Sequence, residues 1–540
     1  MSEKQVLLIS GTGGAYTIRG KDLQNSLFDK KMRESLIKKY YCCDGKCYIP
    51  ENAYFVDEFG KKKKLLRRNQ SGYPPLVTRT LEDILDKGSI SYNSIPCDTM
   101  WENHLFDHDS YKFVCCSTTF MWSERMIDNA IKWINENVEY QYLIIGGHYS
   151  SIKFEQMLSK YPEISYIIVG DGETALPMLI HYLDGEATYG LDEIPNLAFS
   201  NKGELNRTKV KYEDMKSMPK VNYKGHYDRL SYETVRGCAY GCKFCTWDAG
   251  IKCFRFKDSE RILQDVKEYI EENGISRIEI NDSTFFFPFH RIEPVIEGFT
   301  ELGIHWKAHC RADVPWTDEL VEKLGNSNCD ILQIGFESMT DRVLANMNKH
   351  TTAQMNRFTN KMLSKTRIDT VVSFIIGFPD ETLEEFQNTW DYLLNEFEGH
   401  FYLFVFEMED KSLDLWKERA KYGLELYEDK EDCVHGGANW KHNGMNSDQA
   451  NQIRDEVLKS VRRNNSKAIY KSWQSPYEWP FVTNQSRANN IKIERLIDNL
   501  IFLYQDADEK NMQSELLTIV RELDGLGVEF DEEYTSDTIK

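Results

Sequence analysis

The sequence predicts an α/β protein in which two runs of alternating strands and helices are followed by a mainly helical C-terminal region. Apolar segments of strand length alternate with amphipathic helical segments, first within residues 73–185 and again within residues 232–406. Glycine-containing turns follow several of these apolar segments. A chain of 540 residues is also too long for one hydrophobic core. Because strands that alternate with helices form parallel sheets covered on both faces, we expect two such sheets.

The first domain is expected over residues 1–190, as a doubly wound sheet of the flavodoxin or Rossmann type. Residues 16–72 are rich in charge and tyrosine, and we interpret them as an insertion in this domain. The expected strands are Val6–Ile9, Phe113–Cys116, Tyr142–Ile145 and Ile164–Val169. Ligands of such sheets bind beyond the carboxyl ends of the strands, which is where the glycines of this domain fall.

The second domain is expected over residues 229–410, as a partial (β/α)6 barrel of the TIM type. A hairpin and a linker over residues 191–228 precede it, and residues 411–540 form the helical C-terminal region. The expected barrel strands are Thr234–Arg236, Arg277–Ile280, His305–His309, Ile331–Phe336, Thr370–Ile376 and Phe401–Phe406. In such barrels the active face lies at the carboxyl ends of the strands.

Composition narrows the class of protein. The 66 Lys and Arg residues against 86 Asp and Glu residues give a net charge of −20, which argues against nucleic-acid partners bound through phosphate charge. No basic start with a long apolar run resembles a signal peptide, and no apolar stretch reaches transmembrane length. Most of the thirteen cysteines are therefore expected as reduced thiols of a cytoplasmic protein, and these include Cys42, Cys43 and Cys47 in the insertion.

One compact motif carries the chemistry of the second domain. Cys238, Cys242 and Cys245 lie within eight residues, directly after its first expected strand. Thiolates suit iron–sulfur clusters or zinc, but structural zinc sites usually draw four ligands from two separated pairs. Three thiols can hold three irons of a [4Fe–4S] cubane and leave the fourth iron open. Three cysteines packed in a core, or a degenerate zinc site, are the alternatives.

The motif C-x3-C-x2-C, with Phe244 before its third cysteine, resembles the radical S-adenosylmethionine (SAM) superfamily. The resemblance implies that SAM chelates the open iron and is cleaved reductively to a 5′-deoxyadenosyl radical. Four further strand ends are similar to the family in order and spacing. Together with Phe244, the residues that the resemblance places near SAM are Asp282, Arg311, Glu337 and Gly377.

The first domain resembles the cobalamin (B12)-binding domain that precedes many radical SAM barrels. The resemblance rests on residues 73–76, 146–150 and 169–173. It implies that cobalamin contacts Ser117, Thr118, Thr119, Gly146, Gly147, Gly170 and Glu173. The D-x-H-x-x-G motif of cobalamin mutases is missing after the first strand, as it commonly is in methylases of this kind. A flavodoxin-like domain that has lost its ligand is the alternative.

Together the two resemblances imply cobalamin-dependent methylation of an unactivated carbon, or of phosphorus, in a natural-product or cofactor pathway. The expected partners are a small-molecule or peptide substrate and an external electron donor such as flavodoxin or ferredoxin, with no nucleic acid and no membrane. The alternatives are an epimerase, cyclase or ring-rearranging radical SAM enzyme, or a sensor without turnover. An epimerase needs a thiol hydrogen donor, for which Cys433 is the catalytic candidate and Cys310 a weaker one. The stretch Gly436–His442 is distinctive, but the sequence assigns it no role.

Overall fold

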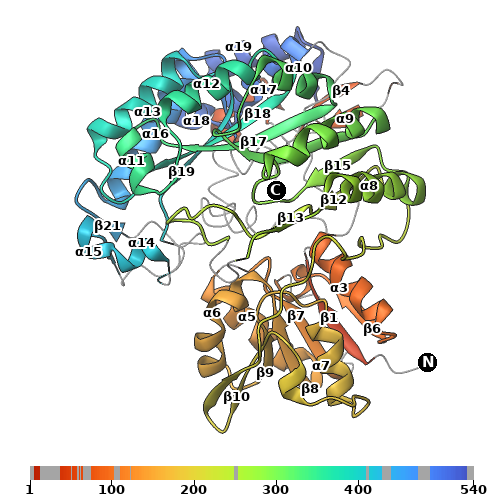
Figure 1. The fold of residues 1–540 in the computed structure, drawn as a ribbon. Coiled ribbons are helices and arrows are strands. Elements are labelled where there is room, and N and C mark those ends of the chain that lie inside the picture. Colours follow the sequence, from red (N-terminus) through yellow and green to blue (C-terminus); the bar gives the residue numbers. More distant parts are fainter. Residues whose placement is uncertain are drawn as a thin grey trace.

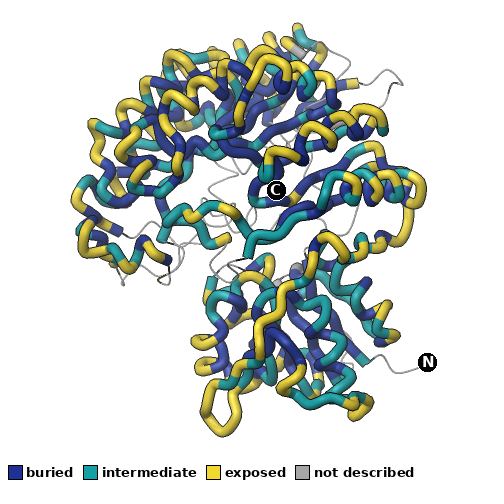
Figure 2. The backbone as a smooth tube through the Cα atoms, in the orientation of Figure 1, coloured by how far each residue is buried: buried dark blue, intermediate teal, exposed yellow. Residues whose placement is uncertain are grey.

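The computed structural model describes most of the chain and shows two α/β layers, with the N-terminal domain below the second sheet (Figure 1). The described residues are 5–11, 37–49, 52–56, 60, 62–64, 75–101, 110–121, 123–247, 253–408, 411, 413–427, 440–471 and 487–531. The strands of both sheets form the buried centre, while the surrounding helices turn exposed positions outward (Figure 2). No helix within these residues is both long and apolar enough to cross a bilayer.

The N-terminal sheet has the strand order β11-β10-β9-β8-β7-β1-β6. Its parallel strands are β1 (Val6–Ile9), β6 (Tyr92–Ile95), β7 (Ser110–Ser117), β8 (Glu139–Gly146) and β9 (Ile164–Ile168). The helices around it are α3 (Leu76–Lys87), α5 (Glu124–Asn137), α6 (His148–Lys160) and α7 (Ala175–Leu183). Separate apolar clusters line its two faces, as the doubly wound arrangement requires. The order reverses between β1 and β7, so a crevice is expected at their carboxyl ends.

The predicted hairpin is present, but it belongs to this sheet. Strands β10 (Leu197–Asn201) and β11 (Glu204–Arg207) pair with each other, and β10 also pairs antiparallel with β9. The N-terminal layer therefore continues to Arg207, and the linker to the second sheet begins after it.

The second sheet is a curved row of seven parallel strands in the order β12-β15-β16-β17-β18-β19-β22. The strands are β12 (Arg229–Tyr232), β15 (Arg277–Ile280), β16 (His305–Arg311), β17 (Cys329–Glu337), β18 (Asp369–Ile376), β19 (Gly399–Val405) and β22 (Ala468–Tyr470). Their outer helices include α8 (Ser259–Asn273), α9 (Ile292–Leu302), α10 (Asp318–Asn326), α11 (Asp341–Asn346), α12 (Ala353–Leu363) and α13 (Leu383–Asn395). Thr317, Thr352 and Thr382 cap three of these helices by accepting a bond from a first-turn backbone N–H. The sheet is open, with β12 and β22 at its edges.

Two details of this sheet differ from the prediction. Its first strand is β12, because the backbone N–H groups of Thr234 and Val235 are bound by the carboxylate of Asp282 and leave the sheet. The segment β13 (Val235–Arg236) pairs instead with β14 (Arg255–Phe256), as a ribbon that flanks the cysteine motif. The seventh strand, β22, comes from the C-terminal region, which was expected to be helical and does contain the long helix α16 (Ser447–Asn464).

The described part of the 16–72 insertion does not pack on the N-terminal sheet. Strand β4 (Ala53–Val56) pairs with β5 (Lys62–Lys64) on one side and with β23 (Val528–Phe530) on the other. Together with α17 (Arg487–Ile501), α18 (Leu503–Asp506) and α19 (Met512–Asp524), these strands enclose a separate apolar core. Figure 1 accordingly shows β4 among the C-terminal helices, far from the N-terminal domain. We call this unit the terminal module.

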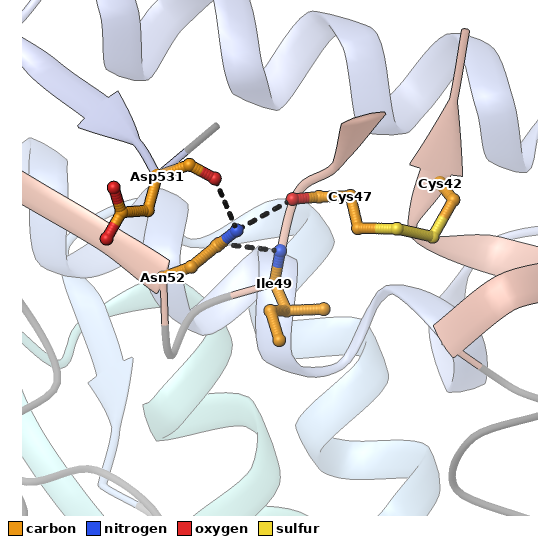
Figure 3. Close-up of a disulfide and its surroundings, with 5 residues drawn as sticks. All are labelled: Cys42, Cys47, Ile49, Asn52 and Asp531. Carbon is orange, nitrogen blue, oxygen red and sulfur yellow. Dashed lines mark hydrogen bonds between the residues drawn. A yellow bond between two sulfur atoms is a disulfide. The ribbon is translucent and has the colours of Figure 1, made fainter. Parts of the chain in front are cut away.

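The terminal module contains a disulfide that the sequence analysis did not expect (Figure 3). Cys42 and Cys47 were predicted as ordinary thiols, but they face each other across the hairpin of β2 (Cys42–Cys43) and β3 (Lys46–Cys47) and are bonded. Their Cα atoms are 4.0 Å apart, which brings the two sulfur atoms within bonding reach. Buried Asn52 donates to the carbonyl of Cys47 at 2.8 Å and accepts from the N–H of Ile49 at 3.2 Å.

Candidate functional site

The cysteine motif lies on the loop between β13 and β14 and is held by segments that follow β15 and β17 of the second sheet. The hydroxyl of Ser283, after β15, donates to the carbonyl of Gly237 at 2.7 Å. The side-chain amide of Asn348, after β17 and α11, donates to the carbonyl of Gly241 at 2.6 Å. Gly237 has φ of +72°, and a Cβ there would lie 2.4 Å from the carbonyl oxygen of Cys253. Glycine is therefore required where the loop closes.

The three thiols of Cys238, Cys242 and Cys245 are all half-buried on this loop. Within the described part of the chain, no three Cys, His, Asp or Glu side chains are close enough to share a single metal ion. The donor set, three thiols on one tightly closed loop, matches what a [4Fe–4S] cluster with one open iron takes.

Arg311, at the end of β16, places a permanent positive charge beside this loop. Its guanidinium lies 3.8 Å from the sulfur of Cys242 and 3.7 Å from the ring centroid of Tyr240. The same guanidinium binds Asp313 at 3.0 Å, which fixes its orientation. A cation held in this way suits anionic ligands, either thiolates or the carboxylate of a bound molecule.

Glu337, at the end of β17, is a buried carboxylate with two polar partners. It pairs with the ammonium of Lys349 at 2.8 Å and accepts from the hydroxyl of Ser373 at 3.0 Å. Its backbone has φ of +64°, at an irregularity in the pairing with β18. A Cβ on Gly335 would lie 2.3 Å from its Oε1, so Gly335 leaves room for the carboxylate.

Asp282 has a supporting position in the structure. One carboxylate oxygen accepts from the N–H groups of Thr234 and Val235 at 2.7 and 3.0 Å, and the hydroxyl of Thr234 donates to the other oxygen. Burial raises the pKa of Asp282 to about 6, although Arg291 lies 3.9 Å away. Asp282 thus holds the segment that leads into the cysteine motif. Its direct contact with SAM stays a prediction.

Two of the residues predicted to lie near SAM, Phe244 and Gly377, come together where β18 ends. The ring of Phe244 meets that of Phe378 edge to face, with 6.3 Å between centroids. Gly377 precedes Phe378 with φ of +81°, and a Cβ there would lie 2.4 Å from the indole of Trp440. The structure therefore brings Phe244 and the end of β18 together, as the motif order suggested.

The structure shows a role for Trp440 and His442 that sequence reasoning missed. The indole N–H of Trp440, in β21 (Trp440–Lys441), donates to the carbonyl of Phe406 at 2.7 Å, and its ring stacks on His442 with 4.9 Å between centroids. Nε2 of His442 lies 3.1 Å from the carbonyl oxygen of Gly377. Burial lowers the pKa of His442 to about 4, so its ring is neutral at physiological pH. Both residues thus fix the loop after β18.

A cavity of about 270 Å³ lies at the carboxyl edge of the N-terminal sheet. Much of its lining is apolar, from residues such as Leu76 and Ile84 of α3 and Ile168 of β9. Six of the seven residues predicted for cobalamin line it, namely Ser117, Thr119, Gly146, Gly147, Gly170 and Glu173. The seventh, Thr118, is buried beside it and donates to the carbonyl of Gly146 at 2.8 Å.

The cavity wall is tied to the cysteine motif by an ion cluster between the domains. Arg236, directly before the motif, pairs with Glu173 and lies 3.3 Å from Asp171. Arg255, its neighbour in the β13–β14 ribbon, also pairs with Asp171. Arg255 donates to the backbone carbonyl of Glu213, and the backbone N–H of Glu213 donates to Asp171, so the cluster extends into the linker. No local sequence pattern indicated these pairings, because their members are far apart along the chain.

Of the two candidates for a thiol hydrogen donor, the structure describes only Cys310. Cys433 lies outside the described residues. Cys310 is buried in the core of the second sheet, with 4% of its surface exposed, and burial raises the pKa of its thiol. This burial fits packing.

The chain combines an N-terminal α/β domain with a second, parallel sheet that carries a C-x3-C-x2-C loop. Comparison with known proteins identifies the domain that contains this loop. Residues 232–393 match the family model of the radical SAM superfamily, so this part of the chain is a radical SAM domain. The chain is 31% identical over 169 residues to a bacteriochlorophyllide d C-12(1)-methyltransferase of Chlorobaculum tepidum, covering 30% of this chain and 36% of that protein. It is 24% identical to the hopanoid C-3 methylase of Methylococcus capsulatus, covering 51% of this chain and 54% of that protein. The chain thus spans between about a third and about a half of the length of these two relatives.

Two solved structures share the fold over most of the chain. The radical SAM methyltransferase TsrM from Kitasatospora setae, with cobalamin and a [4Fe–4S] cluster bound, aligns with a TM-score of 0.57 and 12% identity over 84% of this chain and 96% of its own. The cobalamin-dependent radical enzyme OxsB aligns with a TM-score of 0.55 and 17% identity over 83% and 73%. These alignments show the shared architecture of an N-terminal α/β domain and a radical SAM domain.

Proposed function

We propose that this protein is a radical SAM enzyme that uses cobalamin to methylate an unactivated carbon, or phosphorus, of a small-molecule or peptide substrate. The observation that carries the proposal is the cavity at the edge of the N-terminal sheet. Six of the seven residues predicted to contact cobalamin line it, and Arg236 pairs with one of them, Glu173, directly before the cysteine motif. A cluster with SAM supplies a 5′-deoxyadenosyl radical when bound, and cobalamin supplies a carrier for the methyl group.

The residues divide into three tasks. Cys238, Cys242 and Cys245 would hold the cluster, and Phe244, Arg311, Glu337 and Gly377 would bind and orient SAM, with Asp282 in support. The residues lining the cavity, together with Thr118, would hold the corrinoid. The tightly closed cysteine loop and the apolar residues that line the cavity would keep water from the reacting groups.

The proposal includes an external one-electron donor, such as flavodoxin or ferredoxin, because reductive cleavage of SAM consumes an electron. An oxygen-sensitive cluster that depends on such donors suits the cytoplasm. The competing possibility is a radical SAM epimerase or cyclase whose N-terminal domain binds no ligand. This possibility is favoured only if the cavity binds no corrinoid.

The test begins with anaerobic reconstitution with iron, sulfide and hydroxocobalamin, followed by desalting and measurement of iron and of the corrinoid absorption spectrum. About four irons and one corrinoid per chain support the proposal. A matched pair of variants separates the two sites. Gly147→Leu should reduce corrinoid retention but not iron, because its Cβ would lie 2.7 Å from the backbone nitrogen of Thr119. Cys242→Ser should reduce iron but not corrinoid. Full iron without corrinoid in the unmodified chain contradicts methyl transfer.

A further inference from the structure

Both backbone polar groups of Gly377, its N–H and its carbonyl, are bound by side chains. Its N–H donates to Oε2 of Glu381 at 2.7 Å, and its carbonyl oxygen lies 3.1 Å from Nε2 of His442. The residue before it, Ile376, is the last of β18, so these two bonds replace the sheet bonds that end there. The turn after β18 is therefore fixed by one residue of the turn itself and by one from the C-terminal region, 65 positions later.

The partners of Nδ1 of His442 show which of the two ring nitrogens carries the proton. Nδ1 faces three backbone N–H donors, those of Gly444 at 3.0 Å, Asp380 at 3.2 Å and Met445 at 3.4 Å. A nitrogen that meets only donors acts as an acceptor, so the neutral ring carries its proton on Nε2. His442 therefore donates to Gly377 and accepts from Asp380, and it clamps the turn at two points.

The surroundings leave the clamped turn little freedom to move. The indole of Trp440 stacks on the His442 ring at an interplanar angle of 7° and covers Gly377. On the other side, a Cβ on Gly444 would lie 1.9 Å from the carbonyl oxygen of Glu381, so the two backbones touch. His442 itself is 8% exposed, which places it behind the turn and out of reach of a substrate.

We propose that His442 is a positioning residue for SAM, which acts through its hydrogen bond to the Gly377 carbonyl. This inference rests on the proposed function, in which SAM binds beside the cysteine motif. The bond fixes the peptide unit of Gly377, and this unit places Phe378 against Phe244 on the cysteine loop. Without the bond, the turn and Phe378 lose one of their two anchors, and the surface offered to the adenine becomes less well ordered.

Three substitutions of His442 separate its hydrogen bond to Gly377 from the hydrogen bonds that its Nδ1 accepts from Asp380 and Gly444. Gln places an amide N–H near the position of Nε2 and can restore the bond to Gly377. Asn places an amide oxygen near the position of Nδ1 and can restore only the bonds from Gly444 and Asp380. Ala restores neither. Iron content after reconstitution serves as the control for an intact cysteine loop.

The measurement is the dissociation constant for radiolabelled SAM, by equilibrium dialysis on the reconstituted, unreduced protein. Loss of one buried hydrogen bond predicts binding weaker by about threefold to tenfold for His442→Ala and His442→Asn, and binding within about twofold of the unmodified chain for His442→Gln. Iron content should be the same in all four proteins. Hydrogen–deuterium exchange of the segment after β18 in the cofactor-free chain should rise in His442→Ala and His442→Asn and fall back in His442→Gln.

Two results would overturn the inference: equal SAM binding by all four iron-loaded proteins, or rescue by Asn and not by Gln. Failure of the unmodified, iron-loaded chain to bind SAM is a different outcome. It would refute the proposed function itself, and the inference with it, whereas the exchange pattern would still report on the clamp.

Discussion

Replacing Gly377 by Ala tests the packing of the turn after β18 most directly. The substitution forces a Cβ into a backbone with φ of +81°, which costs about 1–2 kcal/mol for a residue other than glycine. The same Cβ would lie 2.4 Å from Trp440 and 3.2 Å from Ala450, and overpacking of this kind costs a further 1–3 kcal/mol, roughly. Alanine also restricts the unfolded chain, which returns about 0.4–1 kcal/mol. The free energy of unfolding should therefore fall by about 2–4 kcal/mol.

Gly185→Ala is the matched control. Gly185 has a similar φ of +77°, but no atom lies within 4 Å of the position of its Cβ. Only the backbone cost and the restriction of the unfolded chain remain, so its free energy of unfolding should fall by about 1 kcal/mol or less. Urea titrations followed by tryptophan fluorescence and circular dichroism measure both variants. If the two substitutions cost the same within error, Trp440 does not pack on Gly377, and the clamp described above is refuted.

Three further predictions concern other parts of the molecule. The free energy of unfolding should fall by on the order of 3 kcal/mol as the pH drops from 6.5 through 4, because His442 binds a proton in the unfolded chain but not in the folded one. Urea titrations of His442→Gln should lack this part of the loss. Asp171→Asn should destabilise the domain contact by roughly 3 kcal/mol, since it leaves the mostly buried guanidinium of Arg255 without its carboxylate partner. Limited proteolysis of the linker after Arg207 should then speed up, and an unchanged cleavage rate would contradict the role of the ion cluster. Cys238→Ala should lower the iron bound after reconstitution to well below half, whereas Cys253→Ala, from the same loop but outside the motif, should not; equal loss in both would argue against a three-cysteine cluster.

Local patterns in the sequence predicted much of the fold. The strand Val6–Ile9 is buried at all four positions, and an apolar run of that length is a signal that needs no knowledge of its neighbours. The strand Arg277–Ile280 was found in the same way and has the predicted bounds. The cysteine loop followed from the spacing of three residues. These features were accessible because each is determined by residues close together in the chain.

The features that the sequence did not reveal depend on contacts between distant segments. Strand β12 was placed too late because Asp282, about fifty residues further on, removes Thr234 and Val235 from the sheet. No local sequence pattern indicates the contact of His442 with Gly377, because the two residues are 65 positions apart and the stretch around His442 could equally form a surface loop. The bonded pair in the hairpin of β2 and β3 was missed because composition alone cannot show that two side chains face each other.

The terminal module imposes an order of events on the synthesis of the chain. Its strands β4 and β23 are joined by Tyr54 and Glu529, whose side chains bond at 2.7 Å across 475 positions. A ribosome that adds about 5–20 residues each second needs tens of seconds to supply the second strand after the first. During that interval β4 lacks its β23 partner, and the apolar core that it shares with α17 to α19 is incomplete. Closure of this module is thus a late step, and a chain stalled before residue 528 would leave one edge of β4 uncovered.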